Sequence, residues 1–119
     1  MPNFTLEKLN GIAGFVGAAL VDSDSGMALA MLGGGNINLE LAAAGNTEVV
    51  RAKRRVAQSL GLSDSIEDVL STLSSQYHLI GPLESNPLLF LYVVLDRSKS
   101  NLAMARHELK SVEKTLDFS

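Results

Sequence analysis

Residues 14–32, GFVGAALVDSDSGMALAML, decide the fold that we expect for this chain. Two apolar runs flank a polar turn at residues 22–26, where Gly26 is free to adopt a positive φ angle. Neither run alternates between apolar and polar side chains, which is typical of strands in a sheet that is covered on both sides. We therefore expect a covered central hairpin, whose first strand points Val16, Ala18 and Leu20 to one face and Phe15, Ala19 and Val21 to the other.

The composition indicates one globular domain. The chain has 119 residues, of which 46% are hydrophobic and 19% charged, enough for a single core. The net charge of −3 argues against nucleic-acid binding, which relies on a basic face. The lack of cysteine excludes disulfides, thiol nucleophiles and cysteine-ligated metals. Because the sequence shows neither a signal-peptide pattern nor an apolar run of membrane length, we expect a cytoplasmic protein that does not insert into a membrane.

The chain begins with a short segment of helical character. Asn3 is a candidate cap, Phe4, Leu6 and Leu9 are the apolar residues, and Gly11 is a plausible end. This segment predicts a first helix just before the hairpin.

The longest periodic segment spans residues 38–60 and follows a flexible GGGN connection at residues 33–36. Asn36 or Asn38 can cap it, and Gly61 ends it. Its apolar arc is wide enough to contact both a sheet and another helix. The arc consists of Leu39, Ala42, Ala43, Val49, Val50, Val56 and Leu60.

Residues 63–73 give a divided signal. Ser65 and Asp68 fit a capping box, and Ile66, Val69, Leu70 and Leu73 follow a helical repeat, so the segment read alone predicts a helix.

Two strands and a helix are expected after that segment. Residues 76–83 alternate, and residues 88–95 form a nearly continuous apolar run of strand length. Ser98 or Ser100 is expected to cap a final helix, whose apolar face is Leu102, Ala105, Leu109, Val112 and Leu116.

Two stretches resemble the roadblock family of dynein light chains and bacterial GTPase regulators. They are IAGFVGAALVDSDSGMALA at residues 12–30, similar to the family's opening hairpin, and NLAMARHEL at residues 101–109, similar to the start of its last helix. The resemblance implies a single α+β domain over residues 1–119, with three layers and a roadblock/profilin-like fold. A five-stranded antiparallel sheet would carry a long helix on one face and the terminal helices on the other, in the order α-β-β-α-β-β-β-α. It also implies that residues 69–73 form a strand, against the local helical signal.

The same resemblance implies a homodimer, because roadblock domains pair through the second strand and the long helix. An apolar edge strand next to a glycine-rich loop also favours pairing on physical grounds, since it would otherwise be prone to aggregate. The expected interface consists of Met27, Ala28, Leu29, Ala30, Met31, Leu32, Ala42, Gly45, Val49, Ala52 and Val56.

No motif predicts catalysis, a cofactor or a metal. The glycines at residues 11–17 lack the dinucleotide-binding spacing, and residues 22–26 lack the remaining ligands of a calcium loop. His78 and His107 lie far apart in the sequence, and a helix-capping turn explains Asp96 better than a catalytic role. We therefore expect a protein that is not an enzyme.

One basic cluster allows two interpretations. Arg51, Lys53, Arg54 and Arg55 are either a solvated helix end, or a docking surface for an acidic partner that affects association rate more than affinity.

Two functions remain open from the sequence. The preferred one is a non-catalytic homodimeric scaffold or regulator of a small Ras-like GTPase, and the chain has no phosphate loop of its own. The alternative is a profilin-like sensor with a ligand pocket between sheet and helix. Alanine and glycine at the sheet–helix contact leave little room for a ligand and favour the first function.

Overall fold

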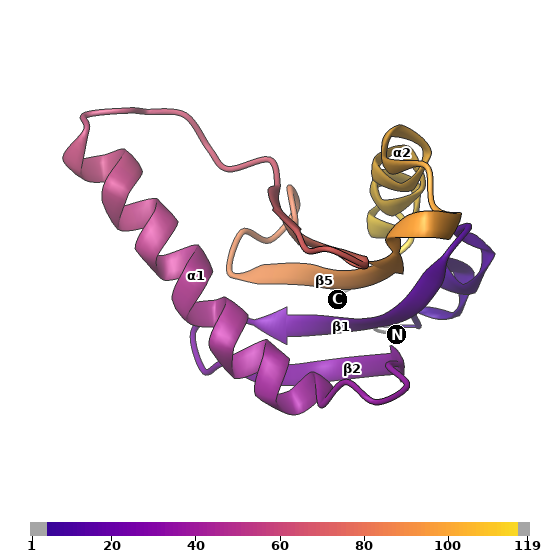
Figure 1. The fold of residues 1–119 in the computed structure, drawn as a ribbon. Helices are drawn as coiled ribbons and strands as arrows, with labels where there is room; N and C mark the ends of the chain where they lie inside the picture. Colours follow the sequence, from indigo (N-terminus) through magenta and orange to yellow (C-terminus); the bar gives the residue numbers. More distant parts are fainter. Residues whose placement is uncertain (1–4, 117–119) are drawn as a thin grey trace.

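A computed structural model describes residues 5–116 and shows a five-stranded antiparallel sheet between two layers of helix (Figure 1). The strands are β1 (Phe15–Asp22), β2 (Met27–Gly33), β3 (Val69–Thr72), β4 (Gln76–Pro82) and β5 (Leu89–Asp96). Their order across the sheet is β2-β1-β5-β4-β3, so β2 and β3 are the two edges. The helical elements are η1 (Glu7–Gly11), α1 (Leu39–Ser59), η2 (Arg97–Lys99) and α2 (Leu102–Glu113). The predicted fold class is therefore confirmed.

The two faces of the sheet have separate cores. Helix α1 covers one face, where Phe90, Tyr92 and Val94 of β5 are buried. Elements η1 and α2 cover the other face, where Leu91, Val93 and Leu95 of the same strand are buried. Strand β5 is thus covered on both sides, which accounts for its continuous apolar run.

Strand β1 departs from the predicted assignment of its first two residues to the faces. Val16 packs on the α1 side, and Phe15 packs on the α2 side, the reverse of what strict alternation predicts. The cause is an irregularity in the pairing with β5 between Phe15 and Gly17, since an extra residue in a strand reverses the faces beyond it. The assignment of Ala18 to Val21 is correct.

Strand β2 is covered less than the hairpin pattern predicts. Its side chains alternate between exposed and half-buried, because it lies at the edge of the sheet. A second irregularity lies between Leu20 and Val21 of β1, opposite Leu29 of β2. As a result Ala28 packs on the α1 side, whereas Ala30 and Leu32 pack on the α2 side.

The glycine-rich connection between β2 and α1 is closely packed at its centre. A Cβ atom on Gly17 would lie 2.5 Å from the Cα of Gly34, so position 17 cannot carry a side chain at that contact. Gly34 itself lies against the side chain of Leu39. These contacts bring the end of β2 directly to the start of α1.

The helix termini follow local side-chain chemistry. Asn38, and not Asn36, caps α1 by accepting a hydrogen bond from the backbone N–H of Leu41. The predicted caps of the last helix, Ser98 and Ser100, are wrong, because Asn101 caps α2.

The capping turn predicted around Asp96 belongs to the short helix η2, which precedes α2. Asp96 Oδ1 accepts hydrogen bonds from the backbone N–H and the hydroxyl of Ser98. These hydrogen bonds lower the pKa of Asp96.

The divided segment at residues 63–73 is not a helix. Residues 63–68 have no regular structure, and the strand implied by the resemblance begins at Val69 and ends at Thr72. The acid of the supposed capping box, Asp68, instead forms two hydrogen bonds with Arg106 of α2. The hairpin with β4 closes through a hydrogen bond from the N–H of Leu73 to the carbonyl of Gln76.

The first predicted helix is shorter than expected. Within the described residues it is a single 3₁₀ turn, η1, with Leu9 buried and Gly11 as its last residue. Asn3 and Phe4, the expected cap and first apolar residue, lie outside the described residues.

Candidate functional site

Helix α1 carries two apolar stripes, only one of which contacts the sheet. The inner stripe is buried and consists of Leu39, Ala43, Thr47 and Val50. The outer stripe has the same helical spacing on the opposite side of the helix and consists of Leu41, Gly45, Val49, Ala52, Val56 and Leu60. Its large members are exposed: Leu41 by 70%, Leu60 by 68% and Val56 by 53%. A second apolar stripe on a helix is typical of a surface that packs against a further element.

Gly45 is at the second position of the outer stripe, and no contact within residues 5–116 requires a glycine there. A Cβ atom built on it would have no neighbouring atom within 4 Å. A glycine inside a helix costs about 0.5–1 kcal/mol relative to alanine. The open space above Gly45 is thus a place that another side chain can enter.

The outer stripe is symmetric along the helix. Its midpoint lies between Val50 and Arg51, and Leu41 and Leu60 are equally far from this point on either side. Gly45 and Val56 form a second equidistant pair, and Val49 and Ala52 form a third. If a second copy crosses α1 antiparallel at this midpoint, Gly45 faces Val56 of that copy, and the leucines fill the widening ends of the crossing.

The free edge of β2 is the other exposed apolar surface near α1. Met27 is 66% exposed, Met31 48% and Leu29 44%, although β2 pairs with β1 on its other side. Its outer edge therefore offers backbone hydrogen-bonding groups next to apolar side chains, which is the arrangement that pairs with a further strand.

The structure divides the eleven interface residues expected from the sequence into two groups. Met27, Leu29, Met31, Gly45, Val49 and Val56 are exposed, whereas Ala28, Ala30, Leu32, Ala42 and Ala52 are half-buried. Of the second group, Ala28 and Ala42 pack against the core under α1. Leu41 and Leu60 are not among the expected residues, although their spacing continues the stripe and they are its most exposed large hydrophobic residues.

The basic cluster separates into two anchored and two free side chains. Arg51 donates to the backbone carbonyl of Asp24 (2.7 Å) and pairs with Glu48 (3.0 Å). Arg54 donates to the carbonyl of Pro87 (2.6 Å). These two arginines thus fasten α1 to the β1–β2 turn and the β4–β5 loop. Lys53 and Arg55 form no hydrogen bond or ion pair with any of residues 5–116 and remain the candidates for contact with a partner.

Three polar side chains that the sequence does not bring together, Gln76, His78 and Tyr92, lie beside α1 on the same face of the sheet. His78 Nε2 is 2.9 Å from Gln76 Oε1, and His78 Nδ1 is 2.9 Å from the hydroxyl of Tyr92. Gln76 Oε1 only accepts, so the neutral ring donates from Nε2 and accepts from Tyr92 at Nδ1. Burial lowers the pKa of His78 and raises the pKa of Tyr92, which is opposed by a hydrogen bond from Asn46 of α1.

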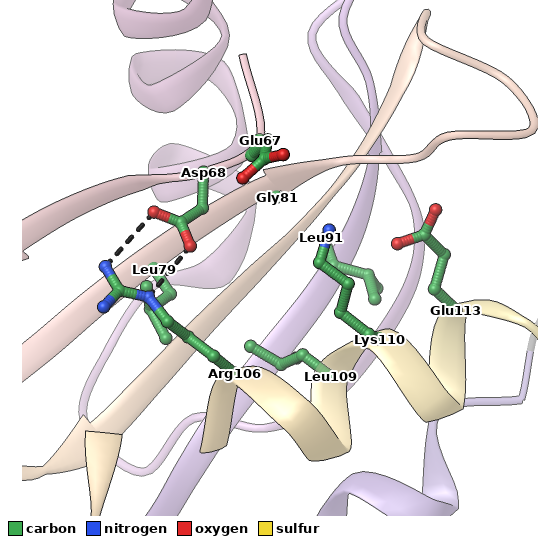
Figure 2. Close-up of a pocket in the computed structure, with 9 residues that line it drawn as sticks. All are labelled: Glu67, Asp68, Leu79, Gly81, Leu91, Arg106, Leu109, Lys110 and Glu113. Atoms are coloured by element: carbon green, nitrogen blue, oxygen red, sulfur yellow. Dashed lines mark hydrogen bonds and ion pairs between the residues drawn. The ribbon is translucent and has the colours of Figure 1, made fainter. Parts of the chain in front are cut away.

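The hollow between α2 and the sheet is small (Figure 2). Leu79, Leu91 and Leu109 line it, and Asp68 and Arg106 close one side through hydrogen bonds of 2.9 and 3.2 Å. Its volume of about 40 Å³ holds little more than water, whereas small-molecule pockets measure roughly 300–1,000 Å³. This hollow gives the profilin-like alternative no ligand site between sheet and helix α2.

Residues 5–116 contain neither a metal-binding cluster nor a membrane span. No group of three or more histidine, cysteine, aspartate or glutamate side chains lies together there in a way that could hold a metal ion. No helix in that part of the chain is both long and apolar enough to cross a membrane.

The fold is that of the roadblock domains. The roadblock/LC7 domain from Streptomyces avermitilis superposes with a TM-score of 0.79 at 17% identity, over 92% of this chain and 88% of that one. MglB from Myxococcus xanthus gives a TM-score of 0.66 at 19% identity, over 92% and 89% of the two chains. The gliding protein MglB from Thermus thermophilus gives 0.70 at 17% identity, over 92% and 86%. No protein-family profile and no curated protein sequence matches the chain.

Proposed function

We propose that this protein is a non-catalytic homodimer that acts as a scaffold or regulator of a small Ras-like GTPase. The observation that carries the homodimer is the outer stripe of α1, which is exposed, symmetric about its midpoint and open above Gly45. A two-fold contact requires a surface that complements itself. Gly45 and Val56 lie at equal distances from the midpoint of the stripe. The small residue of one copy would therefore face the large residue of the other, as a self-complementary surface requires.

The edge of β2 extends the proposed interface from the helix to the sheet. Met27, Leu29 and Met31 are exposed there, and the connection through Gly34 places this strand next to the start of α1. Strand pairing across a two-fold axis would satisfy the free edge of each protomer with the other. The roadblock fold supports this arrangement, because the family pairs through these two elements.

Cysteine pairs test the homodimer directly, since the chain contains no cysteine of its own. Gly45→Cys and Val56→Cys in one chain lie about 16 Å apart along α1, so a disulfide between them must join two molecules. We expect a covalent dimer on mild oxidation, and sedimentation equilibrium of the unmodified protein should give twice the chain mass of 12.7 kDa. A monomer at all concentrations tested would contradict the proposal.

The GTPase partner is proposed from the roadblock resemblance, with Lys53 and Arg55 as the exposed charges that meet it. Exposed charges steer association over a screening length of about 8 Å at physiological ionic strength. Association rates should be measured against a panel of Ras-like GTPases in both nucleotide states, at low and high salt. Lys53→Glu with Arg55→Glu should slow association at low salt, and the difference from the wild type should fade at high salt.

Arg51 and Arg54 are unsuited to that test, because they fasten α1 to two loops. A matched control is Lys8→Glu with Lys114→Glu, since both lysines are exposed and lie on η1 and just after α2, away from α1. No binding to any GTPase of the panel would refute the partner and leave the homodimer standing. Equal association rates for both double variants would refute docking through Lys53 and Arg55.

A further inference from the structure

A groove lies between the C-terminal end of α1 and the segment that follows it. Its volume is about 440 Å³, and it is lined by Lys53, Val56, Ala57, Leu60, Leu62, Ile66, Asp68 and Val69. One wall is therefore the end of the outer stripe, and the other wall is residues 62–68. Leu60 is 68% exposed and Leu62 52%, so the groove presents apolar side chains to solvent.

The far wall of this groove is held at both ends although it has no regular structure. At one end the N–H of Leu62 donates to the carbonyl of Ala57 (3.0 Å). At the other end Asp68 forms hydrogen bonds of 2.9 and 3.2 Å with Arg106 of α2. Ile66 is half-buried between these two points. The groove is thus preformed, which lowers the entropic cost of filling it.

The symmetry of the outer stripe identifies what fills the groove. Leu41 and Leu60 lie at equal distances from the midpoint of the stripe, so an antiparallel crossing brings Leu41 of a second copy to the height of Leu60. Leu41 is 70% exposed, the highest value among the large hydrophobic residues that the structure describes. It lies in the first turn of α1, where Asn38 caps the helix, so its position is well fixed.

We propose that the groove lined by Leu60, Leu62 and Ile66 receives Leu41 of a second copy of this chain. The proposal rests on the homodimer proposed above and adds the segment at residues 62–68 to its interface. Each dimer contains two such contacts, one at either end of the helix crossing. They fix the register of the two α1 helices, because sliding one helix by a turn would withdraw both leucines from their grooves.

Cysteine cross-linking separates this proposal from the homodimer itself. Leu41 and Leu62 lie at opposite ends of α1, about 30 Å apart along the helix, so a disulfide between Leu41→Cys and Leu62→Cys in one chain must join two molecules. We expect this pair to form a covalent dimer as readily as the pair Gly45→Cys and Val56→Cys. Leu41→Cys alone should not cross-link, because the two copies of Leu41 would lie at opposite ends of the crossing.

A second measurement keeps the test independent of disulfide geometry. Leu41→Ala should weaken the dimer at least about tenfold, since it uncovers an aliphatic side chain at both ends. Leu62→Ala should add little to that loss, because the two side chains would share one contact. Leu73→Ala is the matched control. Leu73 is 45% exposed and lines neither this groove nor the neighbouring hollow, so its effect should add fully to that of Leu41→Ala.

The outcomes are distinct. If Gly45→Cys with Val56→Cys cross-links, and Leu41→Cys with Leu62→Cys neither cross-links nor shows coupling in the alanine variants, the groove proposal is wrong and the homodimer remains. If neither pair cross-links and the protein sediments as a monomer, both proposals fall. If Leu41→Cys alone cross-links, the helices cross in another register and the groove has a different occupant.

Discussion

The two stripes of α1 are nearly equal in composition and have opposite surroundings. The inner stripe contains Leu39, Ala43 and Val50 with Thr47, whose hydroxyl donates to the carbonyl of Ala43 (2.8 Å). The outer stripe is at least as apolar, yet Leu41, Val56 and Leu60 are more than half exposed. Hydrophobic spacing therefore identifies both stripes and does not say which one meets the sheet.

What distinguishes the stripes is the use of small residues. Ala43 is fully buried, so its size follows from the sheet beneath it. A methyl group at Gly45 would have no neighbour within 4 Å, so the small size of this residue follows from nothing in its own protomer. The open space above Gly45 therefore fits the proposed second copy, whereas the small size of Ala43 follows from close packing against the sheet.

The largest effect should come from a charge placed on either stripe. Val50→Asp buries a carboxylate among Val21, Phe90 and other core residues, which should destabilise the protein by more than about 3 kcal/mol. Val56→Asp should leave the free energy of unfolding of the protomer within about 0.5 kcal/mol and abolish the dimer. Urea denaturation at several protein concentrations separates the two effects. A folded dimer of Val56→Asp would contradict the proposed role of the outer stripe.

Enlarging a small residue should give opposite signs on the two stripes. Ala43→Leu overpacks a full core and should cost about 1–3 kcal/mol of protomer stability. Gly45→Leu should raise the stability of the helix by up to about 1 kcal/mol, while it fills the space meant for Val56 of the second copy and raises the dimer Kd. Circular dichroism melts at low protein concentration, together with sedimentation, measure both quantities. A Gly45→Leu variant that dimerises as tightly as the wild type would refute the helix crossing.

Arg54 and Arg55 of α1 offer a further comparison, between an anchored and an exposed side chain. Arg54→Gln removes the hydrogen bond to the carbonyl of Pro87 and should cost about 1 kcal/mol. Arg55→Gln removes an exposed side chain without a partner in the described residues and should change stability by less than about 0.5 kcal/mol. Equal effects in thermal denaturation would show that the bond to Pro87 does not hold the helix.

The sequence predicts the elements that depend on neighbouring residues. The cap at Asn38 (one of two candidates, with Asn36), the end of α1 before Gly61 and the continuous strand β5 all follow from side chains within one or two turns of the feature. For these features local chemistry and the final fold agree.

The features that sequence reasoning misses depend on distant contacts. Asp68 forms its hydrogen bonds with Arg106 across 38 residues, which leaves the capping-box pattern without its acid. Arg51 and Arg54 reach carbonyl groups 27 and 33 residues away, so their clustering in the sequence says little about their roles. The reversal of Phe15 and Val16 arises from an irregular register that no pattern of alternation contains. The symmetry of the outer stripe is visible in the sequence, but its exposure is not.

The smallest predicted effect concerns the border between the two stripes, where Asn46 of α1 forms a hydrogen bond with Tyr92, which in turn bonds to His78. Burial lowers the pKa of His78 below its ordinary value of 6.5, so the unfolded chain binds a proton more readily than the folded one. Stability should therefore be complete above about pH 7 and fall as the pH decreases through 6.5, since protonation also replaces the acceptor that Tyr92 uses at Nδ1. The free energy of unfolding, measured by urea titration between pH 7.5 and 5.5 (roughly the range in which histidine titrates), should therefore rise with pH.

His78→Gln should flatten this slope of the unfolding free energy against pH, whereas His107→Gln, a change at an exposed position of α2, should preserve it. A slope that is unchanged in His78→Gln would show that the hydrogen bonds around His78 do not distinguish its two protonation states.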